Sequence, residues 1–127
     1  MSDIIFGVPR PRINSSMMSR YINKVVCFVG RVERVHPTGT AFAVTDGEGQ
    51  HVLVELNFSL DEELSGVVEV IGTVSYRGTI MAITFQWLPE ENGNNFNLEL
   101  YNEAVKFIHR FPEHYPFNMA AGGSDFF

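Results

Sequence analysis

The sequence has 127 residues, of which 45% are hydrophobic and 19% are charged. This length suits one domain, and this composition excludes disordered and fibrous proteins. The formal net charge is −6. Because affinity for nucleic acid depends largely on counterion release by Lys and Arg, this charge argues against a strong phosphate-binding protein.

The sequence has a single cysteine, Cys27, so no disulfide can form within the chain and we expect a reducing compartment. Its neighbours Val25, Val26, Phe28 and Val29 predict a small buried hydrophobe without electropositive surroundings. The first twelve residues show no signal-peptide pattern, and no apolar stretch approaches the length of a membrane span. We therefore expect a soluble intracellular protein without membrane attachment.

The N-terminal extension is expected to cover residues 1–23. Two prolines within residues 9–12 prevent a helix there. Asn14 or Ser15 is then placed to cap a short helix that plugs or covers the domain. The apolar positions of this helix are Met17, Met18, Tyr21 and Ile22.

Five strands are expected next, within residues 24–88. Each is a run rich in β-branched or aromatic residues with alternating apolar positions, bounded by turn residues. In chain order they are residues 24–35, 41–45, 52–56, 67–76 and 79–88. The hairpin turns are residues 36–39, 46–49 and 77–78. Gly30 lies in the middle of the first strand, where a bend or bulge would keep the apolar alternation consistent.

A short helix is expected at residues 59–65, between the third and fourth strands. Ser59 can cap it, acidic residues fill its first turn, and Gly66 follows its end. A long first strand with a central glycine and a helical insertion after the third strand together predict an all-β fold. The predicted architecture is a five-stranded OB barrel, in which the first strand takes part in both sheets. An open five-stranded sheet with helices is the alternative.

A C-terminal amphipathic helix is expected at residues 97–111, between a polar linker at residues 89–96 and a tail at residues 112–127. Asn97 suits the N-cap, and Pro112 follows the end. At about 100° per residue, the apolar side chains form two adjacent stripes that no polar residue interrupts. The first stripe is Leu98, Tyr101, Val105 and Ile108. The second stripe is Leu100, Ala104, Phe107 and Phe111.

This apolar half of the helix is wider than packing on one sheet requires. It favours contacts on two sides, as in a three-helix bundle, and the first stripe has a heptad-like spacing. We therefore interpret residues 97–111 as an oligomerisation helix whose two stripes contact partners. Deep burial against the chain's own barrel is the alternative, and the pattern does not decide which stripe would face the barrel.

Contact with nucleic acid is expected to be weak. OB barrels bind oligonucleotides with aromatic and basic side chains on their second and third strands and in two flanking loops. Here both loops are too short to close over a strand of nucleic acid, and Phe42, Phe85 and Trp87 lie in apolar alternations that predict burial. The candidates for weak contact are Arg31, Arg34, Phe42, Tyr76 and Arg77.

We find no arrangement of residues typical of an enzyme. The four histidines lack the spacing of zinc ligands. The acidic, glycine-containing segment at residues 46–49 suits a hairpin turn and lacks the features of a metal or phosphate loop. We therefore expect no catalysis, no metal, no cofactor and no small-molecule substrate.

Several long segments of the chain are similar to one family, the small subunit of eukaryotic replication protein A. The similarity covers most of residues 9–117 and departs at residues 91–95 and 118–127. The segments that carry it are RIN (12–14), VCFVGRV (26–32), HPTG (36–39), DGEG (46–49), LSGVVEV (64–70), LYNEAVK (100–106) and Tyr115-Pro116.

The resemblance implies an OB fold and membership in a heterotrimer that binds single-stranded DNA. It implies a C-terminal helix that bundles with helices of the large and middle subunits, nuclear location, and roles in DNA replication, repair and recombination. Together with the acidic charge, it predicts an assembly subunit that meets DNA mainly through the complex. An autonomous single-stranded nucleic-acid-binding OB protein and a small OB subunit of a telomere-capping trimer are the alternatives.

Overall fold

The computed structural model describes residues 10–88 and 96–111. The first nine residues, most of the predicted linker (residues 89–95) and the predicted tail (residues 112–127) lie outside the described residues. Within the described ranges, no helix combines the length and the apolar character needed to cross a bilayer.

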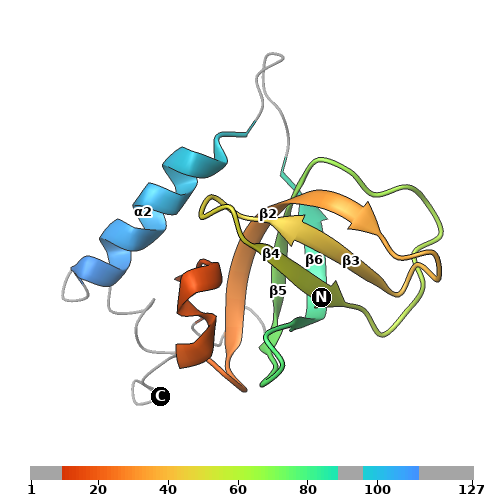
Figure 1. The fold of residues 1–127 in the computed structure, drawn as a ribbon, viewed down its shortest axis with the longest axis horizontal. Helices are drawn as coiled ribbons and strands as arrows, with labels where there is room; N and C mark the ends of the chain where they lie inside the picture. The colour runs from red at the N-terminus through yellow and green to blue at the C-terminus, as the bar shows by residue number, and fades with distance from the viewer. Residues whose placement is uncertain (1–9, 89–95, 112–127) are drawn as a thin grey trace.

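Five strands close into one barrel (Figure 1). They are β2 (Val25–Val35), β3 (Ala41–Thr45), β4 (His51–Glu55), β5 (Val67–Val74) and β6 (Ile80–Trp87). Around the barrel they run in the order β2-β3-β4-β6-β5, and β5 pairs back onto β2. The length of β2 makes this closure possible, because its residues 25–31 pair with β5 and its residues 31–35 pair with β3. The predicted five-stranded barrel is confirmed.

Gly30 lies where β2 passes from one partner strand to the other. The register irregularity of β2 falls later than predicted, between Val32 and Arg34 in its pairing with β3. Gly30 is needed instead for a close approach between strands. A Cβ atom at this position would lie 2.9 Å from the Cβ of Val44 and 3.2 Å from the carbonyl oxygen of Thr45.

Large apolar side chains fill the barrel interior. Phe28, Phe42 and Ile80 are fully buried, and the ring of Phe42 meets that of Phe85 edge-on at 5.6 Å between centroids. Valines of β2, β3, β4 and β5 are buried with them: Val26, Val44, Val54, Val68, Val70 and Val74. Burial of apolar surface is worth about 25 cal/mol per Å², so this core is the main source of stability.

The burial predicted for Trp87 is wrong, and its indole is 48% exposed. Trp87 is the last residue of β6, at the edge of the barrel, where its Nε1 donates to the carbonyl oxygen of Ser65 at 2.8 Å. An extra residue in β6 opposite Ile71 and Gly72 also breaks the alternation of the strand. As a result, Phe85 packs partly buried against the core, whereas Ile83 is exposed.

The short helix predicted at residues 59–65 is wrong, because the chain between β4 and β5 is not helical. The hydroxyl of Ser59 donates to the carbonyl oxygen of Thr38 at 2.8 Å instead of capping downstream amides. The N–H of Leu60 likewise donates to the carbonyl oxygen of Gly39 at 2.8 Å. These bonds tie the loop to the turn that follows β2 and hold it in an irregular path.

The N-terminal segment packs on the barrel in two pieces. β1 (Arg12–Ile13) pairs in parallel with β2, with Arg12 opposite Cys27, and the sequence did not predict this strand. The predicted short helix is present as a 3-10 helix, η1 (Ser15–Arg20), with Asn14 as its N-cap. Its apolar side chains are Met17, Met18 and, just beyond its end, Tyr21, all of which are buried.

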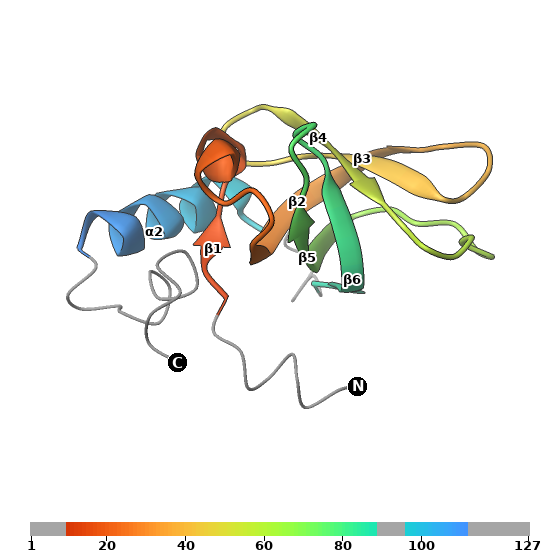
Figure 2. The same cartoon turned by 90° about the horizontal axis from the view of Figure 1, so that it is seen from below.

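The predicted C-terminal helix is present as α2 (Leu98–Arg110). Asn97 caps it as predicted, because its Oδ1 accepts a hydrogen bond from the N–H of Leu100 at 2.9 Å. Figures 1 and 2 show α2 beside the barrel, next to η1 and β1. The helix therefore lies against the domain instead of projecting away from it.

Replacing Gly30 by alanine should destabilise the barrel, because the new methyl group would collide with Val44. We expect Gly30→Ala to lower the free energy of unfolding by about 1–3 kcal/mol, the usual cost of overpacking a core. Urea unfolding followed by tryptophan fluorescence measures this change. The control is Glu33→Ala, an exposed change on the same strand, which should stay within about 0.5 kcal/mol of the wild type. Equal stability of the two variants would contradict the close contact.

Candidate assembly and nucleic-acid interfaces

The side of α2 that faces the domain carries a buried asparagine. Asn102 is 4% exposed. Its Oδ1 accepts a hydrogen bond from Nδ2 of Asn14 at 2.8 Å, and its Nδ2 donates to Oε2 of Glu48 at 2.6 Å. One side chain therefore joins α2 to the N-terminal segment and to the turn between β3 and β4. Because both ends of the amide are satisfied, its burial costs little.

The turn between β3 and β4 lies directly on α2. A Cβ atom at Gly47 would lie 2.5 Å from the Cβ of Asn102 and 2.7 Å from the carbonyl oxygen of Leu98, so only glycine permits this approach. Asp46 connects the same turn to the N-terminal segment, because its Oδ2 accepts a hydrogen bond from the N–H of Ser15 at 2.6 Å. The predicted hairpin turn is confirmed, and it also serves as the docking point of the helix.

The first apolar stripe of α2 packs against the chain's own domain. Val105 is fully buried in the core, and Tyr101 packs against the same core. Leu98 and Ile108 are partly buried. Near the end of the helix, Nε2 of His109 donates to the carbonyl oxygen of Arg12 at 2.7 Å. The middle of the stripe, Tyr101 and Val105, is therefore occupied within this chain.

A charged cluster around Arg12 lies beneath α2. Nη1 of Arg12 lies 2.9 Å from Oε2 of Glu69, 3.0 Å from the hydroxyl of Tyr101 and 3.3 Å from Sγ of Cys27. The prediction that Cys27 lacks electropositive surroundings is wrong, because β1 places Arg12 opposite it. Its predicted burial is confirmed.

Burial and charge together set the protonation of this cluster. Burial, reinforced by Glu69 and partly offset by Arg12, raises the pKa of Cys27 to about 12, so the thiol is protonated and unreactive. Burial also raises the pKa of Tyr101 to about 12. Burial opposes ionisation of Glu69, but hydrogen bonds from Arg12 and Cys27 outweigh it and hold the Glu69 pKa below its ordinary value. The contacts of this cluster therefore connect β1, the barrel and α2.

The second apolar stripe of α2 faces outward. Leu100 is 67% exposed, Ala104 is exposed and Phe107 is half-exposed. The ring of Phe107 packs on that of Phe111 at 4.8 Å between centroids. Residues three and four apart lie on one side of a helix, so these side chains form a continuous apolar row. Contiguous exposed apolar surface marks interaction sites. The structure thus separates the two stripes, which the sequence had left equivalent.

Two of the residues predicted to contact nucleic acid make contacts within the chain itself. Phe42 is 1% exposed in the barrel interior, which removes it from the predicted contacts because no base can reach its ring. Nη2 of Arg31 donates to the carbonyl oxygen of Phe96 at 3.4 Å, next to the start of α2. Arg31 therefore contacts the segment that leads into the helix.

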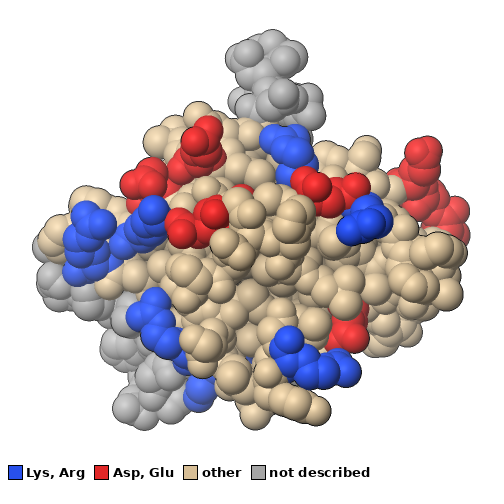
Figure 3. Space-filling model, in the orientation of Figure 1, with Lys and Arg blue, Asp and Glu red and all other residues tan. Residues whose placement is uncertain are grey.

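The other predicted contacts lie on the surface. Tyr76 is 82% exposed in the turn between β5 and β6. Beside it, Nη2 of Arg77 forms an ion pair with Oε1 of Glu55 at 3.0 Å, so its charge is partly neutralised. Arg34 is exposed on β2. Figure 3 shows Lys and Arg interspersed with Asp and Glu on one face, without a continuous basic stripe. In the part of the chain that the structure describes, no cluster of His, Cys, Asp and Glu could hold a metal ion.

Sequence reasoning missed the polar contacts that dock the helix. No role was predicted for Asn102, which is the buried link between α2, Asn14 and Glu48. The available signal was the residue type, because asparagine is a poor helix former that favours local backbone bonds unless something else engages its amide.

Replacing Asn102 by alanine should loosen α2, because Asn14 and Glu48 lose the amide to which they bind. We expect Asn102→Ala to lower the free energy of unfolding by about 1–3 kcal/mol, the cost of leaving the buried amide of Asn14 without this partner, whereas Glu48 keeps its ion pair with Lys106. Hydrogen exchange in residues 98–110 should become faster. The control is Glu103→Ala, which removes one exposed partner of Lys106 and should change the stability little. Identical behaviour of both variants would rule out the docking role of Asn102.

Replacing Glu69 by glutamine should have an effect that depends on pH. Since folding lowers the pKa of Glu69, its ionised form stabilises the protein above the unfolded pKa, about 4.3, and this contribution disappears as pH falls through the folded pKa. Glu69→Gln should therefore cost about 1–2 kcal/mol at pH 7. This cost should shrink as the solution is made acidic. Urea unfolding across this pH range measures both values.

The matched control for that measurement is Glu55→Gln. Glu55 belongs to an exposed pair with Arg77 and should contribute less than about 1 kcal/mol. A destabilisation by Glu69→Gln that stays the same from pH 7 to acid would contradict the ionised Arg12–Glu69 contact.

Solved structures of other proteins share this architecture. The structure of U. maydis replication protein A bound to single-stranded DNA contains a chain with a TM-score of 0.74 and 27% identity, over 85% of this chain and 96% of that chain. Yeast replication protein A bound to single-stranded DNA matches with a TM-score of 0.61 and 11% identity, over 82% and 95%. The telomere capping protein Ten1 from S. pombe matches with a TM-score of 0.60 and 15% identity, over 80% and 98%. At the two lower identities, the likeness shows the fold alone.

The family is shown by the sequence match. The family model described as Replication factor A protein 3 matches residues 6–115, most of the chain. This family consists of non-enzymatic subunits of a single-stranded-DNA-binding complex. The chain therefore belongs to the Replication factor A protein 3 family, the small subunits of replication protein A.

Proposed function

We propose that this chain joins the large and middle subunits of the replication protein A heterotrimer through the second stripe of α2. Its family makes it a subunit of this complex. The observation that carries the proposal is the outward-facing apolar row centred on Leu100, Ala104 and Phe107, on a helix whose Tyr101 and Val105 already pack against its own domain. Burying a large apolar side chain contributes about 1.5–3 kcal/mol, so covering this row favours association.

The docking of α2 on its own domain supports this role. Asn102 and Gly47 hold the helix in one rotational setting, so the second stripe is presented before any partner binds. Preorganisation of this kind lowers the entropic cost of association. Partner helices with apolar stripes of their own would pack against the row and complete a helix bundle.

The two stripes then have different tasks. We assign Tyr101 and Val105, which were predicted to contact partners, to the positioning of the helix on its own domain. Ile108 is partly buried and lies next to Ala104 around the helix, so it extends the outer surface. Phe111 continues this surface beyond the last turn through its contact with Phe107.

We further propose that the chain meets single-stranded DNA mainly as part of the complex, in the nucleus. The net charge of −6 and the pairing of Arg77 with Glu55 both weaken attraction to phosphates. Arg31, Arg34, Tyr76 and Arg77 remain as candidates for weak supporting contacts. The family acts in eukaryotic DNA replication, which supports nuclear location.

Introducing charge into the outer stripe should prevent assembly. We expect Leu100→Glu combined with Phe107→Glu to reduce co-purification with the large and middle subunits at least about tenfold, because carboxylates would be buried at the interface. Thermal unfolding of the chain alone checks that the variant remains folded, since Leu100 is exposed and Phe107 is half-exposed on the outer side of α2. The control is Glu99→Gln combined with Glu103→Gln, on exposed polar positions of the same helix, which should assemble normally. Normal assembly of the Leu100 and Phe107 variant would refute the proposed interface.

A further inference from the structure

The barrel is incompletely closed between β4 and β6. These strands pair only at Val54 with Ile80 and at Glu55 with Met81. On its other side, β6 pairs with β5 along its whole length up to Trp87. In the described part of the chain, residues 82–87 of β6 thus have no strand partner on the side of β4. An unpaired edge of this kind can accept a further strand through its backbone N–H and C=O groups.

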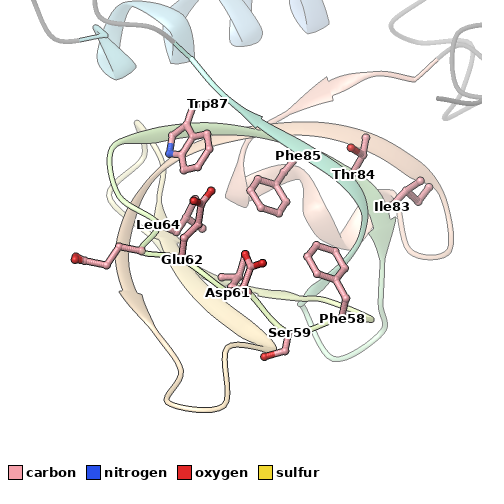
Figure 4. A pocket seen from close by; sticks show the side chains of 11 residues that line it. Phe58, Ser59, Asp61, Glu62, Leu64, Ile83, Thr84, Phe85 and Trp87 are labelled. Carbon is pink, nitrogen blue, oxygen red and sulfur yellow. The ribbon is translucent and has the colours of Figure 1, made fainter.

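A groove lies between this edge of β6 and the loop that connects β4 to β5 (Figure 4). Its volume is about 460 Å³. Ile83, Phe85 and Trp87 line one side, and Phe58 of the loop lies opposite. Phe58, Ile83 and Trp87 are each about half-exposed, so the groove holds a concentration of large apolar side chains in contact with water.

The loop side of the groove is acidic. Asp61, Glu62 and Glu63 line it, and no Lys, Arg or His belongs to its described lining. These three carboxylates take part in no ion pair among the described residues. The groove therefore combines an apolar wall, an open strand edge and negative charge within one loop.

We infer that this groove binds a basic segment of a partner protein, in extended conformation and with apolar or aromatic residues between its Lys and Arg. Such a segment can add to the edge of β6 as a strand, on which alternate side chains point in opposite directions. One set of side chains then enters the apolar wall, and the Lys and Arg side chains reach Asp61, Glu62 and Glu63. The exposed indole of Trp87 offers a further contact to a cation.

The chain's own remaining segments do not have the required charge. All nine Lys and Arg lie within the described residues, so residues 1–9, 89–95 and 112–127 contain none. The same segments contain acidic residues: Asp3, Glu90, Glu91, Glu113 and Asp125. A second copy of the chain is disfavoured by its net charge of −6, and nucleic acid is disfavoured by the carboxylates of the loop.

This site is independent of the proposed assembly surface. The loop between β4 and β5 lies at the end of the barrel away from α2, as both ribbon views show (Figures 1 and 2). Covering the second stripe of α2 therefore leaves the groove open, and the two proposals can fail separately.

The test uses the full chain and a synthetic probe, a fluorescein-labelled octapeptide of sequence Lys-Phe-Arg-Val-Lys-Phe-Arg-Val. Binding is followed by fluorescence anisotropy, and the contact is mapped by amide chemical shifts. The groove variant combines Asp61→Asn, Glu62→Gln and Glu63→Gln, which keep the side-chain shapes. The control variant makes the same change of net charge elsewhere, with Glu33→Gln, Glu99→Gln and Glu103→Gln. Thermal unfolding of both variants checks that they remain folded.

We expect the octapeptide to bind with micromolar affinity and to shift amides of residues 58–64 and 82–87. The groove variant should bind it at least about tenfold more weakly, and the control variant should bind it like the wild type. Equal binding by the two variants, or shifts confined to other residues, would overturn the proposal. The proposal would also be overturned if an oligothymidylate shifted the same amides, because nucleic acid would then occupy the groove. It would be overturned too if sedimentation showed a dimer of the wild type and the control variant that the groove variant no longer forms, because a second copy of the chain would then be the occupant.

Discussion

The contact between Asn102 of α2 and the turn at Gly47 determines which side of α2 this subunit exposes. Without a side chain at Gly47, the backbone of the turn comes within reach of the helix, and the amide of Asn102 bonds to Glu48 on that turn and to Asn14 on the other side. These contacts fix the rotation of α2 about its axis. Rotation decides which of two chemically similar stripes is buried and which faces outward.

Two surfaces at opposite ends of the domain follow from this arrangement. At one end, α2 offers the apolar row around Leu100 without any charge inside it. At the other end, the loop between β4 and β5 combines apolar side chains with three carboxylates. Neither surface suits a phosphate backbone, and the candidate basic residues are few and partly paired. Our proposals therefore assign this subunit of a DNA-binding complex mainly to contacts with other proteins.

The predictions that succeeded depended on local signals. The alternation of apolar and polar residues located the strands. Asn14 and Asn97 marked the N-caps of η1 and α2, and helical periodicity revealed the two apolar stripes of α2. Ser59 and the acids after it also satisfy the rules for a helix start, but in the structure the Ser59 hydroxyl bonds to Thr38, twenty-one residues earlier. The environment of Cys27 and the burial of Asn102 likewise depend on partners far away in the sequence, which no local pattern reveals.

The most direct measurement of the central claim is the accessibility of position 100 before and after assembly. In a Leu100→Cys variant, the new thiol is exposed, while the native Cys27 is buried with its pKa raised to about 12 and should not react. We predict that a maleimide labels this variant rapidly as an isolated chain and at least about tenfold more slowly within the heterotrimer, because burial excludes the reagent. Equal labelling rates in both states would show that the second stripe remains uncovered and would contradict the account.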